Sequence, residues 1–424
     1  MLKQFYFLWI CLLCTVNLFA QAVPKLRIDP ANAYGGTISD YFDQVDYIPL
    51  ETTKESLFGQ ISQLIITDSS MVVTDDDTKA VLFFTPDGKF IRKIKTGEQS
   101  YPRIHYDRTA HTITLNVYNF NTEKTVTTYY DLTGNKFGDK TVFKNSSKEG
   151  RMPFGNNFFL AAEGCHYGTD DKPKDSVYNL LKVYKGDSVY KAFLPYNQKD
   201  NPALCGLVGG IWPRYLPEQG QTYVATPFDF NVYRITTDTA EKIYQVVFPL
   251  SRTMDKEIRE TKNIALIDSL RKDYRWRKEH IITGISNILI KNNYFIFKID
   301  AATYSWGYGS ENSKQYNFIY NLASGRLSSI ERMLPDSANA FLPIMDGFRA
   351  SIDGLGYQDG FFYSSVSSLR LFTVKEATAD KKPVYNAIMQ NFFKQGSRKS
   401  NPVVVRMKIK DEKNKENLKK NTAI

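Results

Sequence analysis

Histidine and cysteine are scarce in this chain of 424 residues, which holds four of each. The histidines are His105, His111, His166 and His280, and none lies in a G-x-S-x-G, H-E-x-x-H or Gly-rich phosphate-binding motif. A hydrolase triad needs a positioned base, so these positions argue against one. Cys165 and His166, with Asp170 and Asp171 after them, lack the ligand spacing of structural zinc sites, and we interpret them as a polar loop.

Long hydrophobic runs are absent except at the N-terminus. There, Lys3 precedes an apolar run from Phe5 to Val16, and the small residues Ala20-Gln21-Ala22 follow. This order is typical of a secretory signal peptide, and the run is shorter than the ~20 residues of a spanning helix. We therefore expect residues 1–22 to be removed, with no transmembrane segment in the mature chain; retention as an anchor is the alternative. Cys11 and Cys14 lack the small preceding residue that favours lipidation.

The mature chain keeps two cysteines, Cys165 and Cys205. In an oxidising compartment they form one bridge or stay as two thiols, and the sequence leaves both open. The net charge is +10, and much of the excess lies after residue 397. Acidic residues interrupt this stretch and aromatic residues do not interleave with it, so residues 411–424 are interpreted as a solvated tail with no nucleic-acid binding. Weak attraction to anionic surface glycans is the alternative.

Aromatic residues are abundant, and the apolar runs that carry them are short, as in β-rich proteins. The stretch VLFFTPDGKFIRKI (81–94) predicts a β-hairpin, because Pro86 presets its own φ and Gly88 accepts a positive φ. The same form returns at 126–140, 180–193, 230–248 and 316–330, and a sixth, degenerate copy is expected at 368–379.

The turn residues of these copies give the period of a repeat. Their spacings are 46, 52, 52 and 87 residues, from Gly88, Gly134, Gly186, Asp238 and Gly325. Residues 251–280 are polar with apolar positions at helical spacing, so a helical insertion explains the long interval. A period of about 50 with four strands per unit indicates an all-β, six-bladed β-propeller with this insertion between the fourth and fifth blades.

The propeller is expected over residues 59–410, after a lead-in at 23–58. A ring of blades must be closed by a strand, and residues 43–51 and 401–410 are both strand-like. We expect at least one of them to close the ring. A β-sandwich with a second β domain is the alternative architecture.

The chain resembles the secreted six-bladed β-propeller proteins of bacterial envelopes. The resemblance rests on IPLETT (48–53), the hairpin at 81–94, TPFDFNVYRI (226–235) and SNPVVVRMKIK (400–410). It implies the fold rather than a chemistry. The family's acidic, Gly-rich element in the last blade is partly matched by residues 344–360, at Asp346 and Asp353. The resemblance therefore implies that this loop matters.

Two Gly-rich loops carry the best candidates for ligand contact, because exposed aromatic rings stack on sugars or on partner proteins. One loop holds Trp212, Arg214 and Tyr215, and the other holds Trp306 and Tyr308. The alternative is that these rings fill gaps between blades. The cluster Asp75, Asp76 and Asp77 lacks the alternation of a calcium loop and is interpreted as a polar corner between strands.

These observations favour a secreted, periplasmic or surface-associated binding module without catalysis. Its expected ligand is a glycan, a peptide or an envelope partner protein. The rival is an enzyme that uses the propeller funnel, such as a metal-assisted hydrolase or a lactonase-like protein. Calcium on the propeller axis would be held by oxygen ligands from several blades, which a motif search cannot detect.

Overall fold

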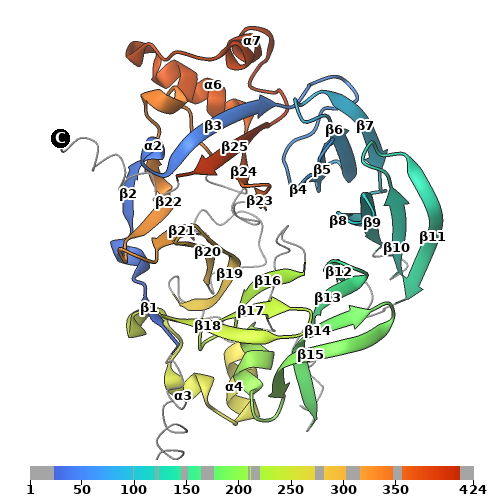
Figure 1. The fold of residues 1–424 in the computed structure, drawn as a ribbon, viewed down its shortest axis with the longest axis vertical. Coiled ribbons are helices and arrows are strands. Elements are labelled where there is room, and N and C mark those ends of the chain that lie inside the picture. The colour runs from blue at the N-terminus through green and yellow to red at the C-terminus, as the bar shows by residue number, and fades with distance from the viewer. Residues whose placement is uncertain are drawn as a thin grey trace, which may run out of the picture.

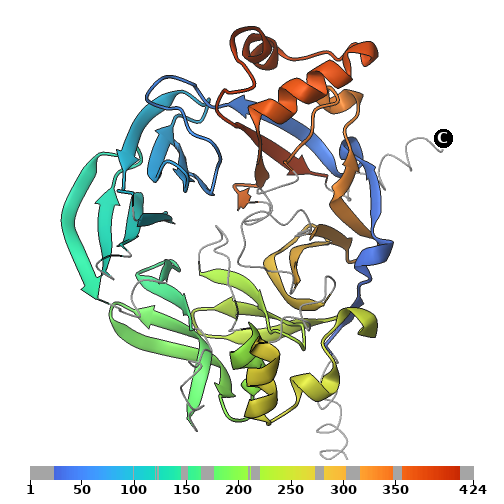
Figure 2. The same cartoon turned by 180° about the vertical axis from the view of Figure 1, so that it is seen from behind.

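A computed structural model describes most of the chain. The described residues are 23–98, 100–119, 121, 124–144, 151–163, 176–208, 211, 220–272, 281–301, 316–346 and 356–410. Six β-sheets stand around a common centre (Figure 1). The predicted six-bladed β-propeller is confirmed. Figure 2 shows the same ring from behind.

Strands that follow one another within a blade pair antiparallel. Blade 1 holds β4 (Gln63–Ile66), β5 (Met71–Asp75), β6 (Ala80–Phe84) and β7 (Phe90–Lys95); blade 2 holds β8 (Ser100–Asp107), β9 (Thr112–Asn119), β10 (Lys124–Tyr130) and β11 (Lys136–Lys144). Blade 3 holds β12 (Met152–Pro153), β13 (Phe158–Ala162), β14 (Val177–Lys185) and β15 (Ser188–Asn197), and blade 4 holds β16 (Gln221–Ala225), β17 (Asn231–Thr236) and β18 (Ala240–Val247). Blade 5 holds β19 (Ile282–Lys291), β20 (Tyr294–Ala301), β21 (Tyr316–Asn321) and β22 (Leu327–Leu334), and blade 6 holds β23 (Gly356–Gln358), β24 (Phe361–Val366) and β25 (Val403–Ile409). The inner edges of the six sheets are formed by β4, β8, β12, β16, β19 and β23 (Figure 1).

The first five predicted hairpins are confirmed. They are β6–β7, β10–β11, β14–β15, β17–β18 and β21–β22. Their turn glycines all have positive φ, for example 88° at Gly88 and 79° at Gly134. Two of the turns are also crowded by neighbouring elements: a Cβ at Gly134 would lie 3.0 Å from the ring of Phe83 in blade 1, and one at Gly88 would lie 2.2 Å from the Pro49 carbonyl oxygen. The repeat is therefore visible because the backbone of these turns favours glycine, and at Gly88 and Gly134 the surroundings do so as well.

The sixth predicted hairpin is wrong. Residues 368–379 lie almost entirely in the helix α6 (Ser368–Ala377), not in two strands. The side chain of Ser367 accepts a hydrogen bond from the Arg370 amide and caps this helix, and no glycine or proline interrupts the segment. A second helix, α7 (Ala387–Gln395), follows before β25. The outer hairpin position of blade 6 is filled by β25 and a strand from the other end of the chain.

The lead-in segment supplies outer strands to three blades. β1 (Lys25–Arg27) pairs in parallel with β18, and β2 (Tyr34–Thr37) pairs in parallel with β22. β3 (Phe42–Pro49) then pairs antiparallel with β25, from Val403 opposite Pro49 to Ile409 opposite Phe42. Both of the strand-like segments proposed for ring closure thus meet each other, and the predicted closure is confirmed.

Asn401 fixes this closure from a fully buried position. Its side-chain oxygen accepts from the Phe58 amide at 3.0 Å, and its side-chain nitrogen donates to the carbonyls of Glu51 (2.7 Å) and Ser56 (3.0 Å). Arg406 adds a contact of 2.7 Å to Asp46 across β25 and β3. The start of β25 is therefore tied to the segment that leads into blade 1.

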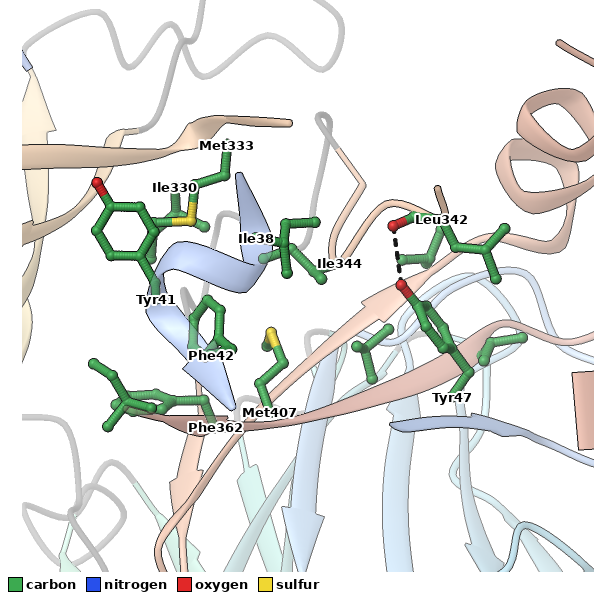
Figure 3. Packing of buried hydrophobic residues seen from close by; sticks show 14 of the residues in the cluster. Ile38, Tyr41, Phe42, Tyr47, Ile330, Met333, Leu342, Ile344, Phe362 and Met407 are labelled. Carbon is green, nitrogen blue, oxygen red and sulfur yellow. Dashed lines mark hydrogen bonds between the residues drawn. The ribbon is translucent and has the colours of Figure 1, made fainter. Parts of the chain in front are cut away.

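The largest hydrophobic cluster joins blades 5 and 6 through the lead-in (Figure 3). The short helix α2 (Ile38–Tyr41) places Ile38 and Tyr41 between the blades. Tyr47 donates to the carbonyl of Leu342 at 3.0 Å, and burial raises the pKa of this phenol. The lead-in is thus part of the core of the propeller.

The remaining helices are short. They are η1 (Pro30–Asn32), η2 (Leu204–Val208), η3 (Leu250–Arg252), α3 (Lys256–Arg259), α4 (Ile264–Lys272), η5 (Ser337–Asn339) and η6 (Ala379–Lys381). η3, α3 and α4 follow β18 in the chain. Within the described ranges, no helix has the length and hydrophobicity that a membrane crossing needs.

Candidate functional site

The longer connections of the ring gather at one of its two ends, which we call the loop face. In an antiparallel blade, the second strand ends where the third begins, and the connection to the next blade attaches at that same end. In blade 3 this end is marked by Ala162, Val177 and Asn197. In blade 5 it is marked by Ala301 and Tyr316. The opposite end carries the short turns between first and second strands.

Most of the candidate ligand contacts lie outside the described residues. They are Trp212, Arg214, Tyr215, Trp306, Tyr308 and Asp353. Of the chain around 302–315, the structure describes the flanking strand ends Ala301 and Tyr316, which belong to the loop face. The polar cluster Cys165, His166, Asp170 and Asp171 is also outside the described residues. These assignments stay predictions.

Asp346 is the one candidate that the structure describes, and its contacts are to the start of α6. Its carboxylate accepts from the Ser367 amide at 2.6 Å, and its own amide donates to the carbonyl of Ser365 at 3.2 Å. Burial raises the pKa of Asp346, and the hydrogen bonds from Ser367 oppose this shift. Asp346 thus joins the connection after blade 5 to the loop-face end of β24.

The three neighbouring aspartates form a turn, as the sequence interpretation expects. Asp75 is fully buried and accepts from the amides of Asp77 and Thr78, both at 3.2 Å, and from the Thr78 hydroxyl at 2.6 Å. Asp76 and Asp77 point elsewhere: Asp76 meets Arg103 of blade 2 at 3.4 Å, and Asp77 accepts from Gln60. The cluster therefore closes a turn and links blades 1 and 2 on the loop face.

A metal site needs several ligand side chains placed close together. Among the residues that the structure describes, no group of three or more His, Cys, Asp or Glu side chains is placed to hold a metal ion. The axial calcium considered from the sequence remains an open prediction.

One boundary between blades is polar. Five boundaries hold hydrophobic clusters, between blades 1 and 2, 3 and 4, 4 and 5, 5 and 6, and 6 and 1. No such cluster joins blades 2 and 3 within the described ranges. On blade 2, Thr127 donates to Asn116 at 2.7 Å, on the side that alternates with the cluster facing blade 1. Burial, with Arg103 nearby, lowers the pKa of His105 on this side to about 4.

Blade 3 presents a matching polar surface toward this boundary. Glu163 receives Lys182 at 3.4 Å and the Tyr184 hydroxyl at 3.2 Å, on the side that alternates with Leu181 and Val183 of the blade 3–4 cluster. The guanidinium of Arg151 lies 3.6 Å from the centre of the Tyr184 ring. Burial raises the pKa of Tyr184, and the Glu163 charge adds to this. Within the described ranges, the sides of blades 2 and 3 that face this boundary thus carry polar side chains, and no hydrophobic cluster joins the two blades.

An ion pair lies at the opposite end of the ring from the loop face. Arg108, in the β8–β9 turn, contacts Asp359, in the β23–β24 turn, at 2.7 Å. These turns belong to blades 2 and 6, which flank blade 1. Asp359 also accepts from Gln358 at 3.1 Å. The pair therefore holds the inner strands together at that end.

Helices cover the loop face beside blade 4. Buried Phe228, Met254 and Ile267 pack together with Ala203, and Leu204 of η2 lies against them. Lys262 contacts Asp200 at 2.6 Å, which connects the segment after β18 to the segment after β15. Cys205, in the same region, is disulfide-bonded. Its partner lies outside the described residues, and Cys165 is the one other cysteine beyond the N-terminal apolar run.

Comparison with known proteins identifies the family and the fold. The model of the family described as "Domain of unknown function (DUF4934)" matches residues 26–408. No curated protein matches the chain.

Two solved structures show how far the likeness extends. A crystal structure from Bacteroides fragilis, of a protein described as exported by inference, has a TM-score of 0.58 and 13% identity over 91% of this chain and 99% of that one. A member of the DUF4221 family from Bacteroides vulgatus has a TM-score of 0.43 and 10% identity over 87% and 97% of the two chains. At such identities, the first likeness supports the propeller fold alone.

Proposed function

The chain belongs to the family of the domain of unknown function DUF4934, and from this premise we propose that it is an exported binding module without catalysis. The observation that carries the proposal is the asymmetry of the ring. One end has short turns joined by an ion pair, and the other collects the long connections on a closed, rigid scaffold. Binding groups are commonly carried on loops that such a scaffold holds in place.

The proposed ligand is a glycan, a peptide or an envelope protein that contacts the loop face. Trp212 and Tyr215 from one connection, and Trp306 and Tyr308 from another, would stack on the ligand. Arg214, Asp346 and Asp353 would supply polar contacts. The helices α3 and α4, as the insertion between the fourth and fifth blades, would flank this surface.

Export to the periplasm is the proposed location. The N-terminal apolar run supports it, as does the disulfide at Cys205, since such bonds persist in oxidising compartments. The similar Bacteroides fragilis protein is described as exported too.

The test is a binding screen of the mature chain, residues 23–424, on arrays of glycans and peptides. We expect Trp306→Ala and Trp212→Ala each to weaken a hit about tenfold or more, because aromatic anchors dominate such contacts. Phe137→Ala is the matched control, since this ring is 46% exposed on the outer strand β11. Unchanged binding in both tryptophan variants would remove these loops from the site.

A metal analysis separates this proposal from the rival enzyme. The purified chain would be assayed for calcium and zinc before and after chelation. Stoichiometric metal, with hydrolysis of an ester or lactone that chelation abolishes, would replace the binding module with a metal-assisted enzyme.

A further inference from the structure

The segment between β24 and β25 of blade 6, which holds α6 and α7 and which we call the helical insertion of blade 6, carries half of the net charge of the chain. Residues 368–399 contain seven basic side chains and two acidic ones, Glu376 and Asp380, which gives 7 − 2 = +5 of the total +10. The basic residues are Arg370, Lys375, Lys381, Lys382, Lys394, Arg398 and Lys399. A single-sign field of this density on a short segment favours an anionic partner.

The same segment exposes large aliphatic side chains. Val384 is 87% exposed, Ile388 is 57% exposed and Leu369 is 54% exposed. Single exposed apolar residues are ordinary on protein surfaces, but here Val384 lies two residues after the exposed pair Lys381 and Lys382. Long lysine stems beside aliphatic residues suit the boundary between lipid headgroups and acyl chains.

The insertion is held firmly on the propeller by its inner side. Leu371, Met389, Phe392 and Phe393 are buried in the cluster that joins blades 5 and 6. The Lys375 ammonium lies 4.9 Å from the centre of the Phe393 ring, and Arg398 contacts Glu376 at 2.6 Å. Figures 1 and 2 both show α6 and α7 at the outer edge of the ring. Packing therefore occupies the inner side, while Lys381, Lys382, Val384, Ile388 and Leu369 are exposed.

The insertion leaves and rejoins blade 6 at the loop face. It begins after Val366, the end of β24, and returns at Val403, which pairs with Val366. At this junction the Ser367 amide donates a hydrogen bond to the Asp346 carboxylate. A membrane or partner surface that contacts α6 and α7 would thus lie beside the loop face, and this contact would fix the orientation of the loop face relative to that surface.

We propose that the α6–α7 segment docks the protein on an anionic lipid surface of the cell envelope. Attraction of the net positive charge brings the segment to the headgroups, and Val384, Ile388 and Leu369 enter the acyl boundary. A lipid surface fits better than an acidic protein, because the charges are spread along the segment and the aliphatic residues face outward. This docking is independent of ligand binding through the aromatic loops.

The test is co-sedimentation of the mature chain with vesicles of phosphatidylcholine alone or mixed with phosphatidylglycerol. We expect binding to the anionic vesicles at low salt, with loss at high salt. The double variant Lys381→Glu/Lys382→Glu should weaken it about tenfold or more. Val384→Asn/Ile388→Asn should weaken binding at low salt without changing the net charge, because these residues supply the apolar contact.

Two controls keep the result specific. Lys89→Glu/Lys95→Glu makes the same change in net charge on blade 1, where both residues are exposed, and should bind like the native chain. A chain that ends at Lys410 tests the basic tail and should also keep binding. The proposal is overturned if the native chain ignores anionic vesicles, if the blade 1 variant weakens binding equally, or if the tail alone accounts for it. Capture of an acidic protein without vesicle binding would also overturn it.

Discussion

Replacement of Asn401 by alanine should destabilise the propeller more than any single cap or surface contact. The change removes one acceptor and two donors from a side chain with no exposed surface. The Phe58 amide and the Ser56 carbonyl would lose this partner, whereas the Glu51 carbonyl would keep its hydrogen bond from the Ser56 hydroxyl. Each unpaired buried group costs about 1–3 kcal/mol, so we expect a total of about 4 kcal/mol after some entry of water.

The assay is equilibrium unfolding in urea, with the slope compared between variants. Asn386→Ala is the matched control, because Asn386 caps α7 through the Met389 amide at 2.9 Å, and such a cap is worth about 1 kcal/mol. Asn401→Asp should be as damaging as Asn401→Ala, since a carboxylate would face two carbonyl oxygens. If Asn401→Ala costs no more than Asn386→Ala, the closure does not depend on this side chain and the reasoning is refuted.

Three further outcomes follow from the structure. Gly88→Ala should lower the midpoint of unfolding more than Gly186→Ala. Both glycines have positive φ, but the new Cβ at Gly88 would lie 2.2 Å from the Pro49 carbonyl oxygen, whereas a Cβ at Gly186 would meet nothing within 4 Å. Equal effects of the two substitutions would contradict this. Burial lowers the pKa of His105 from 6.5 to about 4, so as the pH falls this side chain takes up a proton in the unfolded chain before it does so in the folded one. The stability that neutral His105 contributes is therefore complete above pH 6.5 and is lost as the pH falls toward 4. The loss is about 3 kcal/mol at most, and His105→Gln should flatten that part of a stability curve measured by urea unfolding at several pH values; an unchanged slope would count against it. Peptide mapping without reductant should find Cys205 bonded to Cys165. In the Cys165→Ser variant, Cys205 should react with a thiol reagent once the chain is unfolded. A Cys205 that reacts in the same way in the unfolded, unreduced chain without substitutions would exclude the bond.

Much of the fold could be predicted because its turns leave a local mark. Gly88 and Gly134 are fixed by positive φ and by contact with the preceding blade, so they recur at the period of the blades. The closing strands were predictable as short β-branched runs at both ends. The helix at 368–377 could not be predicted in this way, because apolar residues such as Leu371 fit a strand as well as a helix. The Ser367 cap is the local feature that favours the helix over a hairpin. The parallel strands β1 and β2 are too short to stand out in the sequence.

The candidate site was less accessible to prediction. Asp346 was selected for its family-like context, but its described contacts hold the start of α6. The polar boundary between blades 2 and 3 was missed, since Thr127 and Asn116 meet only after β9 and β10 pair. Alternating threonines in β10 were the one available signal. A contact that forms only when two strands pair leaves no local pattern in the sequence.

The order in which the lead-in finds its partners has a consequence for biogenesis. β1 can pair only after β18 has been synthesised, β2 only after β22, and β3 only after β25. The paired positions include Lys25 with Gln245, Tyr34 with Ser328, and Pro49 with Val403. A chain that is synthesised from its N-terminus therefore leaves each of these strands unpaired until its partner appears, and the partner of β3 appears close to the end of the chain. Closure then comes late and depends on contacts distant in sequence, which slows folding. A chain cut short before β25 would leave β3 without a partner and one edge of β24 unpaired, and such unpaired edges favour aggregation.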